Sequence, residues 1–202
     1  MRFSIIIPAH NADERIGKML RIIKRQVYDK AEYEVIVICD SCEDLTEGVA
    51  ETYGAKVKSV EYHRDGLTRN EGIEMAQGEY ILFLDDDDWW LSDMTLQILD
   101  DLLRMYKDPD ILACGFIWRF RGYALARMYP GGPFWANVWS KVWKRSFIGD
   151  TRFTDVEMES DLHFTRAMLE KEPRIEETPF PLVYYNYMRV GSQTELAGRE
   201  EK

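Results

Sequence analysis

Four consecutive aspartates, Asp85, Asp86, Asp87 and Asp88, follow a short apolar run at residues 80–84. A short run rich in branched and aromatic residues is typical of a buried strand. Carboxylates this close together raise one another's pKa, so they cannot all stay ionised without a partner. A divalent cation is one such partner, because Mg²⁺ and Mn²⁺ prefer oxygen ligands. A solvated acidic turn is the alternative, and the four residues alone do not decide between the two.

The elements that must position this cluster alternate along the first half of the chain. Strands are expected at residues 3–7, 33–39, 57–62 and 80–84, with helices that start at Asp13 and cover 45–53 and 67–76. Strands that alternate with helices form a parallel sheet, whose ligands bind beyond the carboxyl ends of the strands. We therefore expect the polar loop at residues 8–11, Asp40 and the aspartates to lie on one rim.

The second half of the chain is less regular. A helix capped by Ser92 or Asp93 is expected to run to about Met105, followed by a strand at 111–119 and a loop or lid at 121–133, rich in glycine and proline. The spacing of Trp135, Trp139 and Trp143 fits one face of a helix and equally one face of a strand. Thr154 and Glu157 predict a capping box and a helix to about Lys171, and residues 182–188 predict a last strand before a polar, mobile tail.

Composition narrows the class of protein. The chain has 202 residues, 46% hydrophobic and 31% charged, which is typical of a globular domain. Its net charge of -10 argues against nucleic-acid partners and anionic membranes. No apolar run approaches the roughly 20 residues that span a bilayer, and the first residues do not form a signal peptide. We expect a single cytoplasmic domain with no transmembrane segment.

Several common site types are absent from the sequence. No glycine-rich loop follows the first strand, which excludes a dinucleotide fingerprint and a P-loop at that turn. Without such a backbone cradle, a metal at the aspartates is the favoured way to hold a diphosphate. Cys39 and Cys42 have CxxC spacing, but Cys114 is isolated and there is no second pair, so a zinc or redox site is disfavoured. Three cysteines without a disulfide pattern fit a reducing compartment.

Together these segments resemble family 2 glycosyltransferases, which are nucleotide-sugar-dependent enzymes with the GT-A fold. The family's opening strand and loop resemble FSIIIPAHNAD, its second-strand motif IVICDSCEDLT, and its most specific block LTRNEGIEMAQGEYILFLDDDDWW. Its later segments resemble SKVWKRSFI and YYNYMRVGSQT. The resemblance covers almost the whole chain. It implies an α/β, Rossmann-like, mostly parallel sheet flanked by helices, with residues 1–107 binding the nucleotide and 108–202 forming the acceptor-binding part and a lid.

The resemblance also implies roles for single residues. Asp40 matches the acid that bonds the base, and Asp85 and Asp87 match the Asp-x-Asp motif that contacts ribose and metal. The loop that holds the base and ribose corresponds to Pro8, Ala9, His10 and Asn11. Physically, Asp13 could accept from ribose hydroxyls, and the phosphate oxygens could be approached by Arg64, Arg69 or Arg189. Asp86 and Asp88 could assist the metal or orient Arg69.

The segment VEMESDLHF matches a Glu-Asp pair whose aspartate is the family's catalytic base. Here Ser160 replaces the glutamate and Asp161 is retained, while Glu157 and Glu159 are close competitors. Asp161 would accept the proton of an acceptor hydroxyl as its oxygen attacks the anomeric carbon from the opposite face, which contributes about 10²–10⁴-fold. One in-line displacement inverts the sugar.

We therefore expect an inverting hexosyltransferase that depends on Mn²⁺ or Mg²⁺. Its donor would be a nucleoside-diphosphate sugar, a UDP-sugar foremost, and its acceptor a hydroxyl of a glycan, a lipid-linked compound or another molecule bound near residues 121–144. Two alternatives remain open from the sequence: a sugar nucleotidyltransferase, and a nucleotide-sugar-binding module without catalysis. The sequence does not fix the donor sugar, the base or the acceptor.

Overall fold

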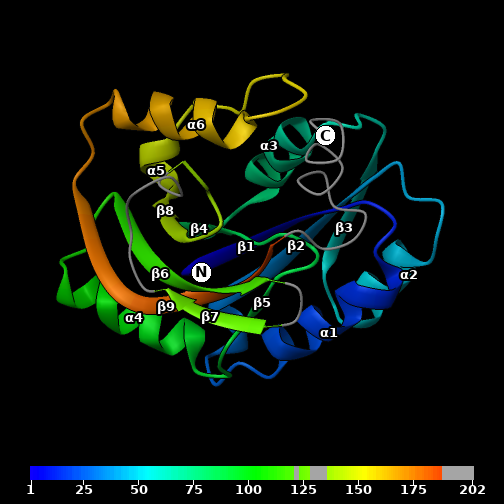
Figure 1. Ribbon diagram of the computed structural model, residues 1–202, viewed down its shortest axis with the longest axis horizontal. Helices are drawn as coiled ribbons and strands as arrows, with labels where there is room; N and C mark the ends of the chain where they lie inside the picture. Colours follow the sequence, from blue (N-terminus) through cyan, green and yellow to red (C-terminus); the bar gives the residue numbers. More distant parts are fainter. Residues whose placement is uncertain (121–122, 128–135, 188–202) are drawn as a thin grey trace.

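The computed structural model describes residues 1–120, 123–127 and 136–187 (Figure 1). The strands are β1 (Phe3–Ala9), β2 (Tyr33–Asp40), β3 (Lys56–Val60), β4 (Tyr80–Phe83), β5 (Trp89–Trp90), β6 (Ile111–Phe120), β7 (Tyr123–Arg127), β8 (Lys141–Lys144) and β9 (Ile175–Tyr187). The helices are α1 (Asp13–Lys24), α2 (Thr46–Thr52), α3 (Asp65–Met75), α4 (Thr95–Met105), α5 (Arg145–Ile148) and α6 (Ser160–Leu169), with a 3-10 turn at Lys30–Glu32.

The strands form one sheet in the order β3-β2-β1-β4-β8-β6-β9-β5, and β7 pairs with β6. The first four strands of that order are parallel to one another. β8 is antiparallel to both β4 and β6, whereas β6 is parallel to β9. The prediction of a single α/β domain with a mostly parallel sheet is therefore confirmed.

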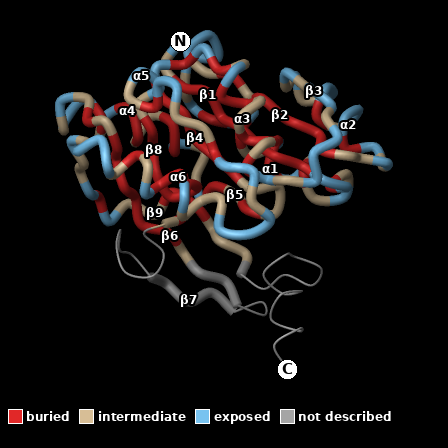
Figure 2. Tube along the Cα trace, turned by 90° about the horizontal axis from the view of Figure 1, so that it is seen from above, coloured by how far each residue is buried: buried red, intermediate tan, exposed pale blue. Residues whose placement is uncertain are grey.

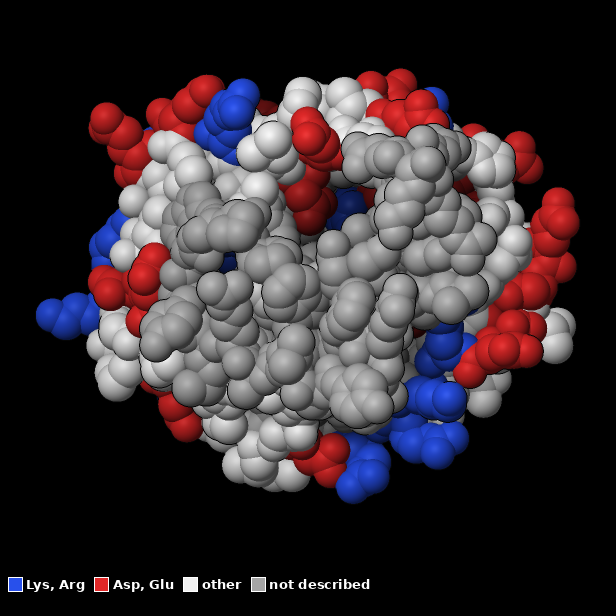
Figure 3. All heavy atoms as spheres, in the orientation of Figure 1, with Lys and Arg blue, Asp and Glu red and all other residues white. Residues whose placement is uncertain are grey.

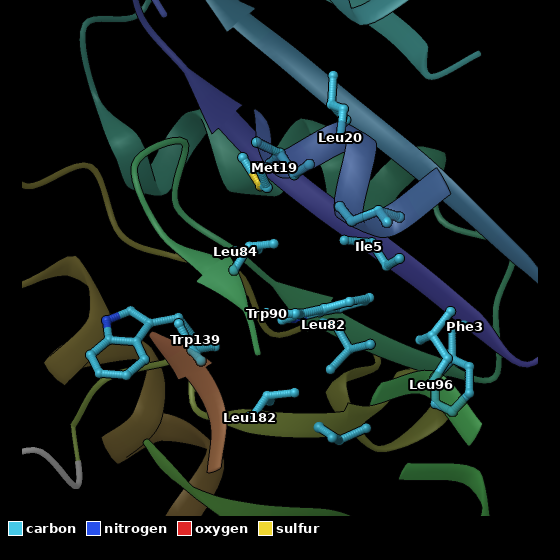
Figure 4. Packing of buried hydrophobic residues seen from close by; sticks show 14 of the residues in the cluster. Phe3, Ile5, Met19, Leu20, Leu82, Leu84, Trp90, Leu96, Trp139 and Leu182 are labelled. Atoms are coloured by element: carbon cyan, nitrogen blue, oxygen red, sulfur yellow. The ribbon is translucent and has the colours of Figure 1, made fainter. Parts of the chain in front are cut away.

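Helices cover both faces of the sheet because the central strands are apolar on both sides. Every residue of β1 is buried, and alternate side chains of a strand point to opposite faces. Ile5 packs with the apolar residues of α1 and α4, whereas Ile6 packs with those of α3 and α6. Figure 4 shows the first of these clusters, with Met19 of α1 beside Leu84. None of the helices in the described ranges is long and apolar enough to cross a membrane.

β3 forms one edge of the sheet and differs from the central strands in its exposure. It carries Lys56 and Lys58 and has no fully buried residue, whereas β1 and β2 are almost entirely buried (Figure 2). Charged side chains on an edge strand prevent pairing with other chains. The parallel strands next to it are therefore the ones that can position a site.

The carboxyl ends of β1, β2 and β4 lie next to one another, because these strands are parallel neighbours. The structure thus places the three predicted segments on one rim. One detail of the prediction is wrong: Pro8 and Ala9 were expected in the loop, but they continue β1 and pair with Ile38 and Cys39. Both are buried, so the exposed loop begins at His10.

The predicted capping box at Thr154 and Glu157 is also wrong, because α6 begins only at Ser160. The preceding segment runs across α3, where the Phe153 ring stacks on that of Phe164 with centroids 4.1 Å apart. The side chain of Asn70 fixes this crossing, since it accepts from the backbone N–H of Phe153 at 2.8 Å and donates to its carbonyl at 2.9 Å. Burial of one aromatic residue has therefore overridden a local helix signal.

The tryptophan spacing indicates neither of the expected faces. Trp139 precedes β8 and packs on one side of the sheet, where its ring stacks on Tyr185 at 4.5 Å, while Trp143 lies in β8 and packs on the other side. Trp135 lies outside the described residues. Part of the predicted loop at 121–133 forms β7, and β9 begins at Ile175 instead of residue 182.

The helix starts also differ from the prediction. α4 begins at Thr95, with Met94 as its N-cap, and neither Ser92 nor Asp93 caps it directly. Instead the side chain of Gln26 accepts the backbone N–H of Leu96 at 3.0 Å. A helix cap formed by a residue far away in sequence leaves no local sequence signal. α3 begins at Asp65, two positions before the predicted start.

A glycine in α3 sets the distance between this helix and the sheet. A Cβ at Gly72 would lie 2.2 Å from Cγ2 of Ile6, whereas one at Gly48 of α2 would meet nothing within 4 Å. We expect Gly72→Ala to lower the free energy of unfolding by about 1–3 kcal/mol through overpacking. Gly48→Ala should raise it by about 0.5–1 kcal/mol, because alanine favours the helix. Chemical denaturation of both variants measures the difference, and equal effects would contradict the close approach of α3 to β1.

Candidate active site

Two arginines neutralise part of the aspartate turn that follows β4. Arg69 of α3 donates from Nη2 to Oδ1 of Asp85 at 2.7 Å. Arg15 of α1 holds Asp86 with two hydrogen bonds, from Nε at 2.8 Å and from Nη2 at 2.7 Å. The repulsion that suggested a metal from the sequence is therefore relieved in part by the protein itself.

Asp88 is relieved in a different way. Its side chain is buried, with Oδ1 accepting the backbone N–H of Asn186 at 2.9 Å, and Oδ2 has no hydrogen-bond partner among the described residues. Burial raises the pKa of Asp88 well above its usual range, and the charges of Asp87 and Asp85 raise it further. Asp88 thus anchors the aspartate turn to β9.

Arg69 links the aspartate turn to the predicted base. Its guanidinium is buried, and Nη1 lies 3.5 Å from Oδ1 of Asp161 while Nη2 bonds Asp85. Burial alone would lower the pKa of Arg69, but the carboxylates of Asp161, Asp85 and Asp65 outweigh it and raise the pKa. Figure 3 shows a hollow in this face between α3 and α6, with acidic and basic side chains at its floor.

Asp161 lies in the first turn of α6 with its side chain 25% exposed. Its Oδ2 accepts the backbone N–H of Val138 at 3.1 Å. Burial raises the pKa of Asp161, and Asp85 adds to the rise, while Arg69, Val138 and Lys141 oppose it. The competitors Glu157 and Glu159 are exposed, and none of the ion pairs among the described residues joins them to Arg69. The geometry therefore favours Asp161, over Glu157 and Glu159, as the carboxylate that faces Arg69 in the cleft between α3 and α6.

Asp40, at the end of β2, orders the loop after β3. Its Oδ1 accepts from the backbone N–H groups of Tyr62 at 2.7 Å and His63 at 3.0 Å, and its Oδ2 accepts from Arg64 N–H at 3.1 Å and Thr68 Oγ1 at 2.8 Å. Burial alone would raise the pKa of Asp40, but these hydrogen bonds lower it. A contact between this carboxylate and a base stays a prediction.

The loop after β1 ties the three carboxyl ends together. Nδ1 of His10 lies 2.7 Å from the carbonyl of Asp40, and its backbone N–H lies 3.4 Å from Oδ2 of Asp86. Oδ1 of Asn11 accepts the backbone N–H of Glu43 at 2.9 Å. Arg15, besides holding Asp86, donates to the carbonyls of His10 and Asn11 at 2.9 and 2.7 Å. His10 and Asn11 are both exposed on the rim and can meet a ligand.

The other predicted nucleotide contacts are less central. Asp13 is the first residue of α1, and its backbone N–H donates to Asp44 at 3.0 Å. The side chain of Arg64 donates to the carbonyl of His63 and lies 3.5 Å from Asp155, so it stands at the edge of the rim. Arg189 lies outside the described residues. The three cysteines are free, and burial raises the pKa of the Cys39 thiol to about 12, which does not fit a reactive thiolate.

The aspartate turn can be tested for its fit to a cation. No group of three or more His, Cys, Asp or Glu side chains able to hold a metal occurs within the described ranges. Asp85 and Asp87 offer two carboxylates on one turn, and Mg²⁺ is usually held by one or two carboxylates together with substrate phosphates and water. Two carboxylates, one of them already paired with Arg69, are too few to form a metal site alone, so an ion could be held here only together with a diphosphate and water.

Arg15 and Lys141 were missed from the sequence as parts of this site. Arg15 belongs to the helix that follows the first predicted strand, so the sequence could have placed it near the rim. Its pairing with Asp86 has no signal in the sequence. Lys141 lies in a stretch whose fold the sequence left open.

Comparison with known proteins points to one family. The sequence model described as "Glycosyl transferase family 2" matches residues 4–173. The poly(ribitol-phosphate) beta-N-acetylglucosaminyltransferase TarS of Staphylococcus aureus is 35% identical over 95 residues, which cover 44% of this chain and 17% of TarS. The match thus spans less than a fifth of that relative's length.

Two solved structures are similar in fold. That of S. aureus TarS with UDP-GlcNAc has a TM-score of 0.83 at 22% identity, covering 96% of this chain and 61% of that one. That of the mannosyltransferase PcManGT from Pyrobaculum calidifontis, with GDP-Man and Mn²⁺, has a TM-score of 0.71 at 19% identity, covering 98% and 59%. At these identities the likeness establishes the GT-A fold of the chain.

Proposed function

The chain belongs to glycosyl transferase family 2, and on that premise we propose that it transfers a sugar from a nucleoside-diphosphate sugar to an acceptor hydroxyl with inversion. One observation carries the proposal: Arg69 joins Asp85, on the turn suited to a diphosphate and its cation, to Asp161, the carboxylate suited to a base. The diphosphate of the donor and the catalytic base would then lie at opposite ends of one buried guanidinium.

The donor would bind along the rim formed by β1, β2 and β4. The nucleobase would lie against two loops, that of His10 and Asn11 and the one that Asp40 orders. The ribose would lie near Asp13 and Asp85, and the phosphates would point toward the aspartate turn and Arg64. TarS with UDP-GlcNAc and PcManGT with GDP-Man bind their nucleotides on the same fold. We propose a UDP-sugar as the first donor to test, because the relative with the higher TM-score binds one.

Asp85 and Asp87 would hold a Mn²⁺ or Mg²⁺ ion that arrives with the diphosphate. When bound, such an ion neutralises the charge that develops on the leaving diphosphate. Arg15 keeps Asp86 fixed and neutralised, and Asp88 anchors the turn to β9, so the turn is ordered by the protein before the donor binds. Preorganisation of this kind avoids reorganisation during the reaction.

Asp161 would accept the proton of the acceptor hydroxyl. Its Oδ2 is occupied by the Val138 N–H, and Arg69 lies beside Oδ1, so the carboxylate is fixed by hydrogen bonding on one side and by charge on the other. As the acceptor oxygen attacks the anomeric carbon, the bond from that carbon to the diphosphate oxygen breaks on the opposite face. We propose a glycan, lipid-linked or polyol hydroxyl as the acceptor; TarS acts on poly(ribitol-phosphate).

The reaction can be tested by following the products. The purified chain is given UDP- and GDP-sugars with Mn²⁺ and a panel of glycan, lipid-linked and polyol-phosphate acceptors. It should release nucleoside diphosphate at an appreciable rate only when a cognate acceptor is present. Release of pyrophosphate from a nucleoside triphosphate and a sugar phosphate would instead indicate a nucleotidyltransferase. Donor binding without consumption under every condition would indicate a binding module.

A further inference from the structure

Lys141, the first residue of β8, is buried in a way that calls for explanation. Its side chain is 2% exposed, and it is the only lysine among the buried residues of the described chain. Taking an ammonium group out of water is costly unless it is paired and hydrogen-bonded. Its surroundings must therefore contain groups that compensate for the charge.

The contacts of Lys141 lead to the proposed base through one peptide unit. Its Nζ donates to the carbonyl of Asn137, and lies 3.3 Å from Oδ1 of the same residue. That carbonyl belongs to the same peptide group as the N–H of Val138, which donates to Oδ2 of Asp161 at 3.1 Å. An ammonium, a peptide and a carboxylate thus form a continuous hydrogen-bonded chain, and such chains polarise each member.

The peptide in the middle of this chain is held rigidly. The carbonyl of Val138 accepts the indole N–H of Trp143 at 3.0 Å. On the other side, the carbonyl of Ala136 accepts the hydroxyl of Thr165, in α6, at 2.7 Å. Oδ1 of Asn137 accepts the hydroxyl of Ser140 at 2.5 Å. Bonds from β8 and α6 therefore fix the turn at residues 136–140 beside Asp161.

We propose that Lys141 is a positioning residue for the reaction: through the Asn137–Val138 peptide it fixes Oδ2 of Asp161 and favours the ionised carboxylate. This inference rests on the proposed function, in which Asp161 is the base. Lys141 does not touch substrate in this role, since the peptide stands between it and the carboxylate. Without its charge, the same carboxylate would face the cleft less firmly held and more readily protonated.

The charges around both groups agree with this role. Burial lowers the pKa of Lys141 to about 7, although Asp161 from α6 and Cys114 from β6 oppose the fall, so the ammonium is charged over the more acidic range in which a carboxylate titrates. Asp161 is faced by Arg69 from α3, Asp85 from the aspartate turn, the Val138 N–H and Lys141. Because a cation next to a carboxylate favours its ionised form, loss of the Lys141 charge should raise the pKa of Asp161.

Lys141→Met, which removes the charge and keeps the length, tests the proposal. We expect the turnover number at pH 6, where Lys141 is charged, to fall about tenfold or more, since a hydrogen bond from a charged group is lost, while the dissociation constant for the nucleoside diphosphate stays within about twofold. The acidic limb of the rate profile should move to higher pH by about one unit. Lys141→Arg, which keeps a positive charge at this position, should keep most of the wild-type rate. Lys171→Met removes a lysine whose Nζ donates to the backbone carbonyls of Phe147 and Ile148. It is the matched control and should neither lower the turnover number nor move the acidic limb.

If Lys141→Met does not fold, Lys141→Gln keeps a donor toward the Asn137 carbonyl and removes the charge, and its acidic limb should still move. An unmoved limb in a folded variant, or an equal loss in binding and turnover, would overturn the positioning role. Asp161→Asn separates a failure of the proposed function from a failure of the role of Lys141. If that variant keeps transferring sugar, the assignment of the catalytic base fails. If it is inactive while the Lys141 variants behave like wild type, only the role of Lys141 fails.

Discussion

Replacing Asp161 by asparagine is expected to abolish sugar transfer and to leave nucleotide binding nearly unchanged. An amide cannot accept the proton of the acceptor hydroxyl, and loss of a general base costs about 10²–10⁴-fold. Asparagine keeps the shape of the side chain, and its oxygen can still accept the Val138 N–H that now bonds Oδ2. The donor contacts on the rim are made by other residues. Steady-state rates and a binding titration with the nucleoside diphosphate measure the two effects separately.

Glu157 and Glu159 provide the matched controls for this experiment. Both are exposed and lie within a few residues of Asp161. Glu157→Gln and Glu159→Gln should therefore keep the rate within about twofold, as is usual for surface substitutions that touch no special feature. If either glutamine variant lost activity while Asp161→Asn kept it, the base would be the glutamate.

The second large effect is expected at Asp87. Asp87→Asn removes one of the two carboxylates proposed to hold the cation, and metal stabilisation of a developing negative charge is worth several kcal/mol. We expect kcat/KM to fall by about 10²-fold or more, since each 1.4 kcal/mol corresponds to a factor of ten. The loss should be partly recovered at high Mn²⁺ concentration, which a titration of the rate against Mn²⁺ would show.

Asp93→Asn is the control for the change in charge. Asp93 lies a few residues further on and pairs at the surface with Arg25, whose side chain is 67% exposed, so its loss should have little effect on stability or rate. Asp85→Asn is less informative on its own, because it also breaks the pair with Arg69. Equal rates for Asp87→Asn and wild type at limiting Mn²⁺ would exclude Asp87 as a metal ligand.

The parts of the fold that the sequence predicts well are those with strong local patterns. Residues 3–7 and 33–39 are largely apolar runs, interrupted only by Ser4 and Glu34, and they form β1 and β2 with small shifts at the ends. Because parallel strands bring their carboxyl ends together, the rim followed from topology alone. Gly54 follows Tyr53, the C-cap of α2, with a φ of 86°, a left-handed conformation that commonly places glycine directly after a helix.

The parts that the sequence misses depend on contacts between distant residues. The pairing of Arg15 with Asp86 and the crossing of Phe153 over α3 are tertiary interactions with no periodic signal. Glu159 adopts a left-handed backbone conformation just before α6, with a φ of 65°, which a capping-box pattern does not anticipate. The link from Lys141 to Asp161 requires the position of one peptide group, and no spacing rule supplies it.

The central claim is that the rim beside the aspartate turn binds a nucleoside-diphosphate sugar together with a divalent cation. Calorimetric titration of UDP- and GDP-sugars into the chain, with Mn²⁺ and then with a chelator, tests it most directly. We predict binding of at least one donor that weakens about tenfold or more without the ion, and that is lost in Asp87→Asn but kept in Asp161→Asn. Absence of binding for every donor in the presence of Mn²⁺, or binding that is indifferent to both the ion and Asp87, would contradict the account.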